Sequence, residues 1–190
     1  LNEGRPVRTC PLTDEEKAVV DGWFLLTCKP VLYAANISED DLGGDVENLP
    51  LVKEVKAVAE KENARVMVIS AKVEEEIAQL PPEEKKEFLE ELGISASGLD
   101  RLVQVSYDLL GLISYLTAGP KEVRAWTIEK GTKAPQAAGK IHSDFEKGFI
   151  RAEIVAYDDL VREGSMAACK EKGLVRSEGK DYVMQDGDVT

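Results

Sequence analysis

The chain has 190 residues, 43% hydrophobic and 32% charged, a composition typical of a globular protein that buries a core. Its formal net charge of −12 at pH 7 is unevenly spread, and no DNA partner is expected. No apolar run approaches the roughly 20 residues that cross a bilayer, and the first residues do not resemble a signal peptide. We therefore expect no membrane partner and a cytoplasmic location.

The charge distribution predicts two parts. Residues 1–117 hold 12 Lys and Arg against 23 Asp and Glu, whereas residues 118–190 hold 12 against 13. The turn residues of "TAGP" follow at this point, so we place a domain boundary near Thr117 to Pro120. The three cysteines, Cys10, Cys28 and Cys169, are widely spaced and are expected to be reduced thiols, with no metal site.

The first predicted elements are a helix, a strand, a helix and a strand. Thr13 and Glu16 form a capping box that opens a helix running towards Cys28. A short apolar strand covers residues 31–34, and helical spacing of apolar residues follows from Leu51 to Asn63. A second apolar strand, "RVMVIS", completes a βαβ unit, which predicts that the two strands are parallel.

Polar residues follow both strands at the same expected edge of the sheet. Asn36, Ile37 and Glu39 follow the first strand, and Ser70, Ala71 and Lys72 end or follow the second. Ligands of open α/β sheets bind at the carboxyl ends of the strands, so these two groups predict a ligand site.

Two more helices are expected before the boundary. One covers "EEKKEFLEEL" and stops at Gly93, and the next carries an apolar stripe from Leu99 to Leu110. The acidic cluster Glu74, Glu75 and Glu76 is expected to be a solvated helix face.

The second part has mainly strand patterns. "LISYLTA" and "EVRAWTI" predict a hairpin, followed by a short helix from Ala134 to Gly139 and a strand in "FIRAEIVAY". "KDYVMQDGDVT" predicts a strand before an Asp-Gly turn, with the final strand missing. His142 is expected to be structural or at the surface. Core or packing positions are expected for three aromatic residues, namely Trp23, Trp126 and Phe145.

These residues carry a resemblance to a known family. "NISE", "SAK", the long run from Thr117 to Glu153 and "EGKDYVMQDGDV" resemble the YchF subfamily of Obg-related P-loop NTPases. The last two stretches resemble its C-terminal TGS domain, a small ubiquitin-like β-grasp fold. The resemblance implies an α/β fold, the C-terminal half of a P-loop NTPase domain with parallel strands and helices, followed by an α+β TGS domain.

The implied domains have definite limits. Residues 1–28 would end a helical insertion, residues 29–116 would form the back half of the nucleotide-binding domain, and residues 117–190 would form the TGS domain. The P-loop motif G-x-x-x-x-G-K-[ST] has no counterpart in this sequence. We therefore expect a fragment of a longer protein or a truncated form, which has no catalytic residue and no metal ligand and is inactive alone. ATP or GTP with Mg²⁺ would be cofactors of the full-length parent only.

The resemblance also implies a role for the polar edge in binding a purine nucleotide. Related GTPases end this strand with N-K-x-D, whose Asp accepts two hydrogen bonds from guanine. Here Ile37 and Glu39 stand at the Lys and Asp positions, and the longer Glu side chain cannot take the same pose. Asn36, the Ile37 backbone, the Ala71 amide and the Lys72 stem would still reach the base. We expect ATP to be accepted alongside GTP or in preference to it.

Two functions from different classes remain open. The chain is either part of a translation-associated or stress-linked nucleotide hydrolase, or a non-catalytic TGS module that binds ribosome, RNA or a protein partner. The basic residues of the second part are possible contacts for phosphate groups. Their net positive charge is small compared with that of dedicated nucleic-acid binders. They are Lys121, Arg124, Lys130, Lys133, Lys140, Lys147 and Arg151.

Overall fold

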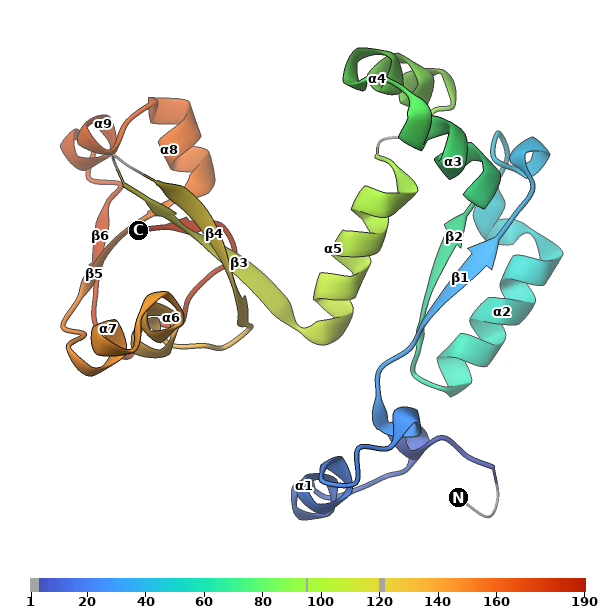
Figure 1. The fold of residues 1–190 in the computed structure, drawn as a ribbon, viewed down its shortest axis with the longest axis horizontal. Helices are drawn as coiled ribbons and strands as arrows, with labels where there is room; N and C mark the ends of the chain where they lie inside the picture. Colours follow the sequence, from blue (N-terminus) through green and yellow to red (C-terminus); the bar gives the residue numbers. More distant parts are fainter. Residues whose placement is uncertain (1–3, 95, 120–121) are drawn as a thin grey trace. The chain divides into compact units, whose positions relative to one another are not determined.

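The computed structural model describes residues 4–94, 96–119 and 122–190, and the chain divides into two compact units after Leu109. Figure 1 shows the elements of both units in chain order. Each unit is described by itself. Lys121 and Pro120 lie outside the described residues.

The first unit begins with short helical pieces. The predicted capping box is present, because Thr13 accepts from the Glu16 amide and the Glu16 carboxylate accepts from the Thr13 amide. The helix α1 (Asp14–Asp21) ends well before Cys28, in contrast to the prediction. Phe24 lies in the left-handed region with a φ of 53°, which a right-handed helix cannot contain. Two single turns of 3-10 helix flank α1, namely η1 (Val7–Thr9) and η2 (Leu26–Cys28).

A parallel strand pair forms the centre of this unit, as predicted. The strands β1 (Leu32–Asn36) and β2 (Arg65–Ile69) pair in register from Leu32 with Arg65 to Asn36 with Ile69. They are joined by α2 (Pro50–Lys61), which starts with Pro at its first position and buries Val52 and Ala59. The loop before α2 contains two 3-10 turns, namely η3 (Glu39–Asp41) and η4 (Val46–Asn48).

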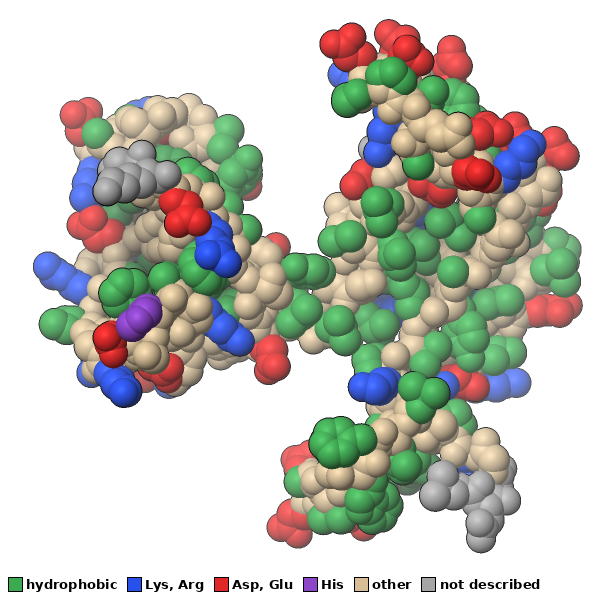
Figure 2. All heavy atoms as spheres, in the orientation of Figure 1, with side chains coloured by type: hydrophobic (Ala, Val, Ile, Leu, Met, Phe, Trp, Pro, Cys, Tyr) green, Lys and Arg blue, Asp and Glu red, His purple; other side chains and the backbone are tan. Residues whose placement is uncertain are grey.

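Three helices follow β2, namely α3 (Ala71–Gln79), α4 (Pro82–Glu91) and α5 (Gly98–Leu110). The prediction that Gly93 stops α4 agrees with its positive φ of 67°. Figure 2 shows acidic side chains gathered over α4 on the face drawn. Glu74 is not simply solvated, because its Oε1 accepts from the Gly98 amide at 2.7 Å and so joins α3 to the start of α5.

The second unit is a five-stranded sheet with helices. Its strand order is β4-β3-β7-β5-β6, in which β7 is parallel to β3 and antiparallel to β5. The predicted hairpin and the predicted helix from Ala134 are confirmed. The elements are β3 (Leu112–Ala118), β4 (Val123–Glu129), α6 (Ala134–Ile141), α7 (Ser143–Lys147), β5 (Ala152–Ala156), α8 (Tyr157–Glu163), α9 (Met166–Glu171), β6 (Arg176–Glu178) and β7 (Asp188–Val189).

Side chains on both faces of this sheet are buried. Ile154 and Val155 are adjacent in β5 and therefore point to opposite faces, where each belongs to a different core cluster. Figure 1 shows α6 and α7 on one side of the sheet and α8 and α9 on the other. Tyr115 is buried with the first cluster, and its hydroxyl donates to the Ala137 carbonyl at 2.7 Å. Burial raises the pKa of Tyr115 to about 12.

The expected boundary of this unit needs correction, and its last residues form a short strand. A boundary at residue 117 would cut through β3, which belongs wholly to the second unit. After the turn at Gly187, with a φ of 78°, the two-residue strand β7 lies between β3 and β5 at the centre of the sheet. The segment before the turn forms only an isolated bridge between Lys133 and Val183. A strand of two residues has no periodic pattern of its own, so β7 can be recognised only from its pairing with β3 and β5.

The remaining global expectations concern cysteines and membrane spans. Cys10, Cys28 and Cys169 are free thiols, as expected. Among the helices that the structure describes, none combines the length and apolar character that crossing a membrane requires.

Candidate functional site

The carboxyl ends of β1 and β2 bring the two predicted polar groups together. Asn36 is the last residue of β1 and pairs with Ile69, the last residue of β2. The Ile37 amide donates to the Ile69 carbonyl at 2.8 Å, which extends the pairing by one residue. The carbonyl oxygen of Ile37 is therefore the part of its backbone that is left to contact a base.

Asn36 is held in one orientation by the start of α3. Its Oδ1 accepts from the Ala71 amide at 2.9 Å, a contact between residues that are 35 positions apart. This bond uses the Ala71 amide that was expected to reach a base directly. The bond also fixes which way the Asn36 side-chain amide is turned. Its Oδ1 faces Ala71, and the two N–H donors of Nδ2 remain available to a ligand.

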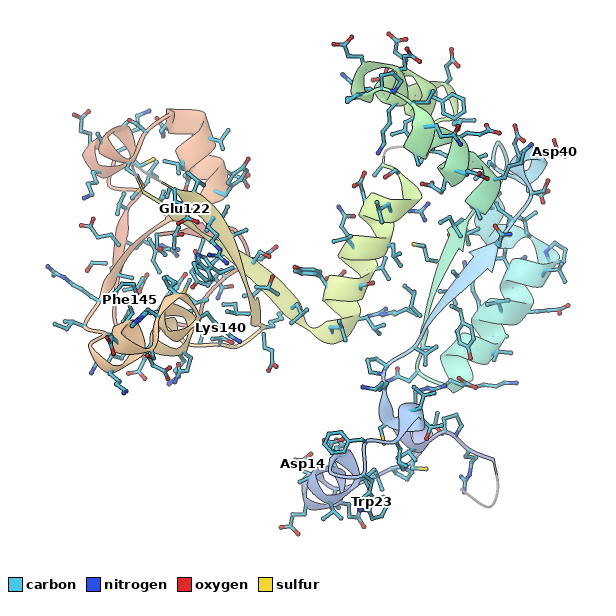
Figure 3. All side chains as sticks on the ribbon, viewed as in Figure 1. Asp14, Trp23, Asp40, Glu122, Lys140 and Phe145 are labelled. Carbon is cyan, nitrogen blue, oxygen red and sulfur yellow. The ribbon has the colours of Figure 1, made fainter. Side chains whose placement is uncertain are left out.

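A second contact joins the same two loops. The Lys72 ammonium pairs with the Glu39 carboxylate, at the first position of η3. The hydrogen bond to Glu39 and its charge raise the pKa of Lys72, with smaller contributions from the charges of Glu76 and Asp40. Figure 3 shows Asp40, the neighbour of Glu39, at this end of the β1–β2 sheet.

Ser70 is the buried residue of the site. It lies between β2 and α3 with 3% of its surface exposed, and its Oγ has no hydrogen-bond partner among the described residues. Although it occupies the N-cap position of α3, its hydroxyl makes no capping bond. An unsatisfied buried hydroxyl costs about 1–3 kcal/mol, so this group is available to a ligand or a water molecule.

A hollow of about 620 Å³ opens beside the end of β1. Asn36, at the end of β1, and Ile37, just after it, line one side of the hollow. On the other side, the hollow is lined from the start of α2, by Leu49, Pro50, Leu51, Val52 and Val55. Its volume is within the range of small-molecule pockets. Ser70, Ala71 and Lys72 do not line it, so the hollow and the predicted base contacts share only the β1 side.

The predicted phosphate contacts of the second unit do not share one environment. Lys133 pairs with Asp181 at 2.9 Å, and the Arg124 guanidinium stacks over the Trp126 ring at 4.2 Å. No ion pair to a described residue is made by the other four described cations of this set, namely Lys130, Lys140, Lys147 and Arg151. Lys121, the seventh predicted contact, lies outside the described residues.

The aromatic expectations are confirmed in part. Trp126 packs against the first core cluster, whereas Trp23 is 59% exposed and Phe145 is 54% exposed, so neither of these two is a core residue. The Phe145 ring does pack near the His142 ring, with 6.0 Å between the ring centroids. Phe145 lies in the short helix α7, which His142 caps, since its Nδ1 accepts from the Asp144 amide. The histidine is an exposed structural residue, as predicted. No group of His, Cys, Asp and Glu suited to a metal ion occurs in the described ranges.

Comparison with known proteins gives consistent matches. A family model described as "YchF-GTPase_C: Protein of unknown function (DUF933)" matches residues 112–190. The ribosome-binding ATPase YchF of Bacillus subtilis (strain 168) is 57% identical over 185 residues, which are 97% of this chain and 50% of that protein. The Obg-like ATPase 1 of Rattus norvegicus is 43% identical over 192 residues, which cover 100% of this chain and 48% of that protein.

A solved structure agrees with these relatives. The Schizosaccharomyces pombe YchF GTPase matches with a TM-score of 0.83 and 39% identity, over 99% of this chain and 50% of that chain. The chain thus spans about half the length of the relatives it matches. Because both units align with YchF proteins at this identity, the chain belongs to the YchF subfamily of Obg-related P-loop NTPases.

Proposed function

We propose that this chain is part of a ribosome-associated nucleotide hydrolase and supplies the half of its site that recognises the base. The observation that carries the proposal is the junction of the two loops, where Asn36 binds the Ala71 amide and Glu39 pairs with Lys72. The names of the relatives, ribosome-binding ATPase and Obg-like ATPase, support both activities. A cytoplasmic location follows from ribosome association.

The geometry favours recognition that accepts adenine. With Oδ1 engaged by Ala71, the Nδ2 group of Asn36 can donate to purine N7, which adenine and guanine share. The Ile37 carbonyl can accept from the adenine amino group. The Glu39 carboxylate is already engaged by Lys72, so it is a poor acceptor for the two guanine donors. We infer that ATP is accepted alongside GTP or in preference to it.

The nucleotide phosphates and Mg²⁺ would be bound by residues that are not part of this chain. Phosphoryl transfer needs a cradle of backbone amides, a Lys and Mg²⁺ around the β- and γ-phosphates. The printed sequence contains no G-x-x-x-x-G-K-[ST] motif that would build this cradle. The residues described here would bind and orient the purine, and the hydrolytic step would depend on the part of the relatives that this chain does not span.

We propose that the second unit is a TGS domain with a β-grasp fold, and that residues 1–28 end a helical insertion. A helix follows the opening hairpin, and the last strand of the unit lies parallel beside the first, which supports the proposal. The TGS domain would begin at β3 and not at residue 117. The alternative function, a non-catalytic module that contacts ribosome or RNA, is favoured by the four cations without an ion pair to a described residue, namely Lys130, Lys140, Lys147 and Arg151.

The test is a change of base preference in a full-length protein that carries this chain. Glu39→Asp with Ile37→Lys should shift the affinity ratio towards GTP by about 1–3 kcal/mol, the usual worth of a good bidentate base contact. Calorimetric titration with ATP and GTP measures the ratio in both versions. Glu75→Asp is the matched control, because Glu75 is an exposed residue of α3 outside the two loops. An unchanged ratio would show that the side chains at positions 37 and 39 do not select the base.

A further inference from the structure

We propose that Glu39 and Lys72 form a latch that holds the two base loops together, and that both residues position other groups instead of reading the base. The inference rests on the proposed function of this site. The Glu39–Lys72 latch is defined by the ion pair between η3 and the first turn of α3. It predicts that breaking the pair weakens the binding of both nucleotides, whichever base they carry.

The latch joins loops that have few other connections among the described residues. Beyond the strand ends, they are linked by the bond from the Ala71 amide to Asn36 Oδ1 and by the Glu39–Lys72 pair. Breaking the pair would free η3, which follows Asn36 closely in the chain, and would loosen the first turn of α3, which carries the Ala71 amide. The orientation of the Asn36 side chain depends on that amide. The Glu39–Lys72 latch therefore affects base binding indirectly, by keeping the Asn36 side chain in its orientation.

The charges around Lys72 give the Glu39–Lys72 pair a second role in nucleotide binding. Lys72 lies in the field of Glu39, Asp40 and Glu76, all of which raise its pKa. Glu39, Asp40 and Asp41 form the whole of η3, so this rim is strongly acidic. A nucleotide is an anion, and an acidic rim repels it at short range. Lys72 both closes the loops and neutralises part of this rim.

The size of the effect is limited by exposure. The side chain of Lys72 is 67% exposed and that of Glu39 is 47% exposed. Solvent-exposed ion pairs are weak, and removal of such a pair corresponds to about a two- to fivefold weakening of affinity. A bound base would cover the pair and strengthen it, so the upper part of this range is expected.

Charge reversal separates a latch from a simple effect of net charge. In the full-length protein, Glu39→Lys makes the rim more positive, and net charge alone would tighten ATP and GTP binding. The latch predicts the opposite, about a two- to fivefold weakening for both nucleotides, because two ammonium groups then face each other. Lys72→Glu should also weaken both. The double variant, Glu39→Lys with Lys72→Glu, restores an ion pair and should recover affinity to within about twofold of wild type.

The experiment is isothermal titration with ATP and with GTP, at low salt and at high salt. Glu75→Lys is the control, since it makes the same charge reversal at an exposed position of α3 that forms no ion pair with a described residue. It should leave affinity unchanged or slightly raised. Tighter binding by Glu39→Lys, or no recovery of affinity in the double variant, would overturn the latch. The proposed function would still stand in that case, provided that the wild-type protein binds nucleotide. Failure of the wild-type protein to bind either nucleotide would overturn both.

Discussion

At the scale of single residues, one carboxylate links the start of the chain to the βαβ unit. Glu62 accepts from Arg8 Nη2 at 2.6 Å and from the Tyr33 hydroxyl at 2.9 Å. These two hydrogen bonds lower the pKa of Glu62, chiefly the one from Arg8, and the bond to Glu62 raises the pKa of Tyr33. Arg8 also approaches the Thr27 carbonyl at 3.5 Å, so it connects η1, η2 and the end of α2.

The lowered pKa of Glu62 predicts an acid-sensitive first unit. A carboxyl whose folded pKa is depressed stabilises the fold above its unfolded pKa, near 4.5, and this contribution is lost as the pH falls through the folded pKa. Glu62→Gln should therefore lower the free energy of unfolding at pH 7 and flatten its decline below about pH 4.5. Urea denaturation followed from about pH 3 to pH 7 measures both effects.

The control for this experiment is another carboxyl of the same region. Glu60→Gln changes the same charge at an exposed position of α2. The free energy of unfolding of this variant should fall below about pH 4.5 as steeply as that of the wild type. A Glu62→Gln variant whose stability falls as steeply as wild type below about pH 4.5 would show that the Arg8 and Tyr33 bonds do not persist in solution.

At the scale of elements, the packing of α5 against α3 depends on a glycine. A Cβ on Gly98 would lie 2.7 Å from Cδ and Oε1 of Glu74 and 2.8 Å from Cδ1 of Ile69. Gly98→Ala would ordinarily favour a helix, but here it displaces the carboxylate that accepts from the Gly98 amide. We expect a net destabilisation of about 1–3 kcal/mol, the usual cost of overpacking.

Two variants test this explanation by chemical denaturation. Gly98→Ala combined with Glu74→Ala removes the carboxylate and most of the collision, so the two changes should be non-additive. Gly43→Ala is the matched control, because a Cβ there meets no atom within 4 Å. Additive effects of Gly98 and Glu74 would contradict a direct contact between them.

The short strand β7 gives the second prediction at this scale. It joins two parts of the sheet, because Thr190 bonds to Leu116 and Ala118 of β3 while Val189 pairs with Val155 of β5. Asp188 is 2% exposed, and its carboxylate accepts from three groups, on Arg176, Tyr182 and Gln185. Removing residues 186–190 would leave β4-β3 and β5-β6 unpaired at the centre of the sheet.

We therefore expect a chain ending at Gln185 to lose the cooperative unfolding of the second unit. Near-ultraviolet circular dichroism of Trp126 and the tyrosines, recorded during thermal unfolding, reports on this change. Asp188→Asn is a milder variant and should cost about 1.5–3 kcal/mol, the usual value for hydrogen bonds to a charged group. Removal of residues 1–4 is the control and should leave the second unit unchanged. A truncated chain with a native transition would contradict the central role of β7.

The elements that the sequence predicted correctly have strong local signals. The capping box at Thr13, the βαβ pattern and the β3–β4 hairpin each encode their structure within short stretches of sequence. Elements that depend on distant pairing were missed, including β6 and the two-residue β7. The candidate site was predicted as two groups on one edge. The bond from Ala71 to Asn36 and the Lys72 pair depend on tertiary geometry and could not be inferred from spacing.

At the scale of the whole molecule, charge is divided between the two units. The first unit, residues 1–109, holds 12 basic and 23 acidic residues, whereas residues 110–190 hold 12 and 13. Within the second unit several cations are already neutralised by a carboxylate. Examples are the pairs of Lys170 with Glu153, of Lys172 with Glu163 and of Arg176 with Asp188. The cations free to meet phosphate are therefore a smaller set than the composition suggests, and Lys133 is not one of them.

This smaller set gives the last prediction, made for a full-length protein that carries the chain. If Lys140 and Lys147 meet ribosomal RNA, Lys140→Glu with Lys147→Glu should weaken co-sedimentation with ribosomes and reduce the salt slope by about one unit for each phosphate that is no longer bound. Lys53→Glu with Lys61→Glu makes the same change of net charge on exposed residues of α2 and is the control. If ribosome binding changes neither with salt concentration nor with the charge reversals at Lys140 and Lys147, a hydrophobic protein contact is indicated instead. The exposed Phe145 and Ile150 of the same unit would then be the next residues to change.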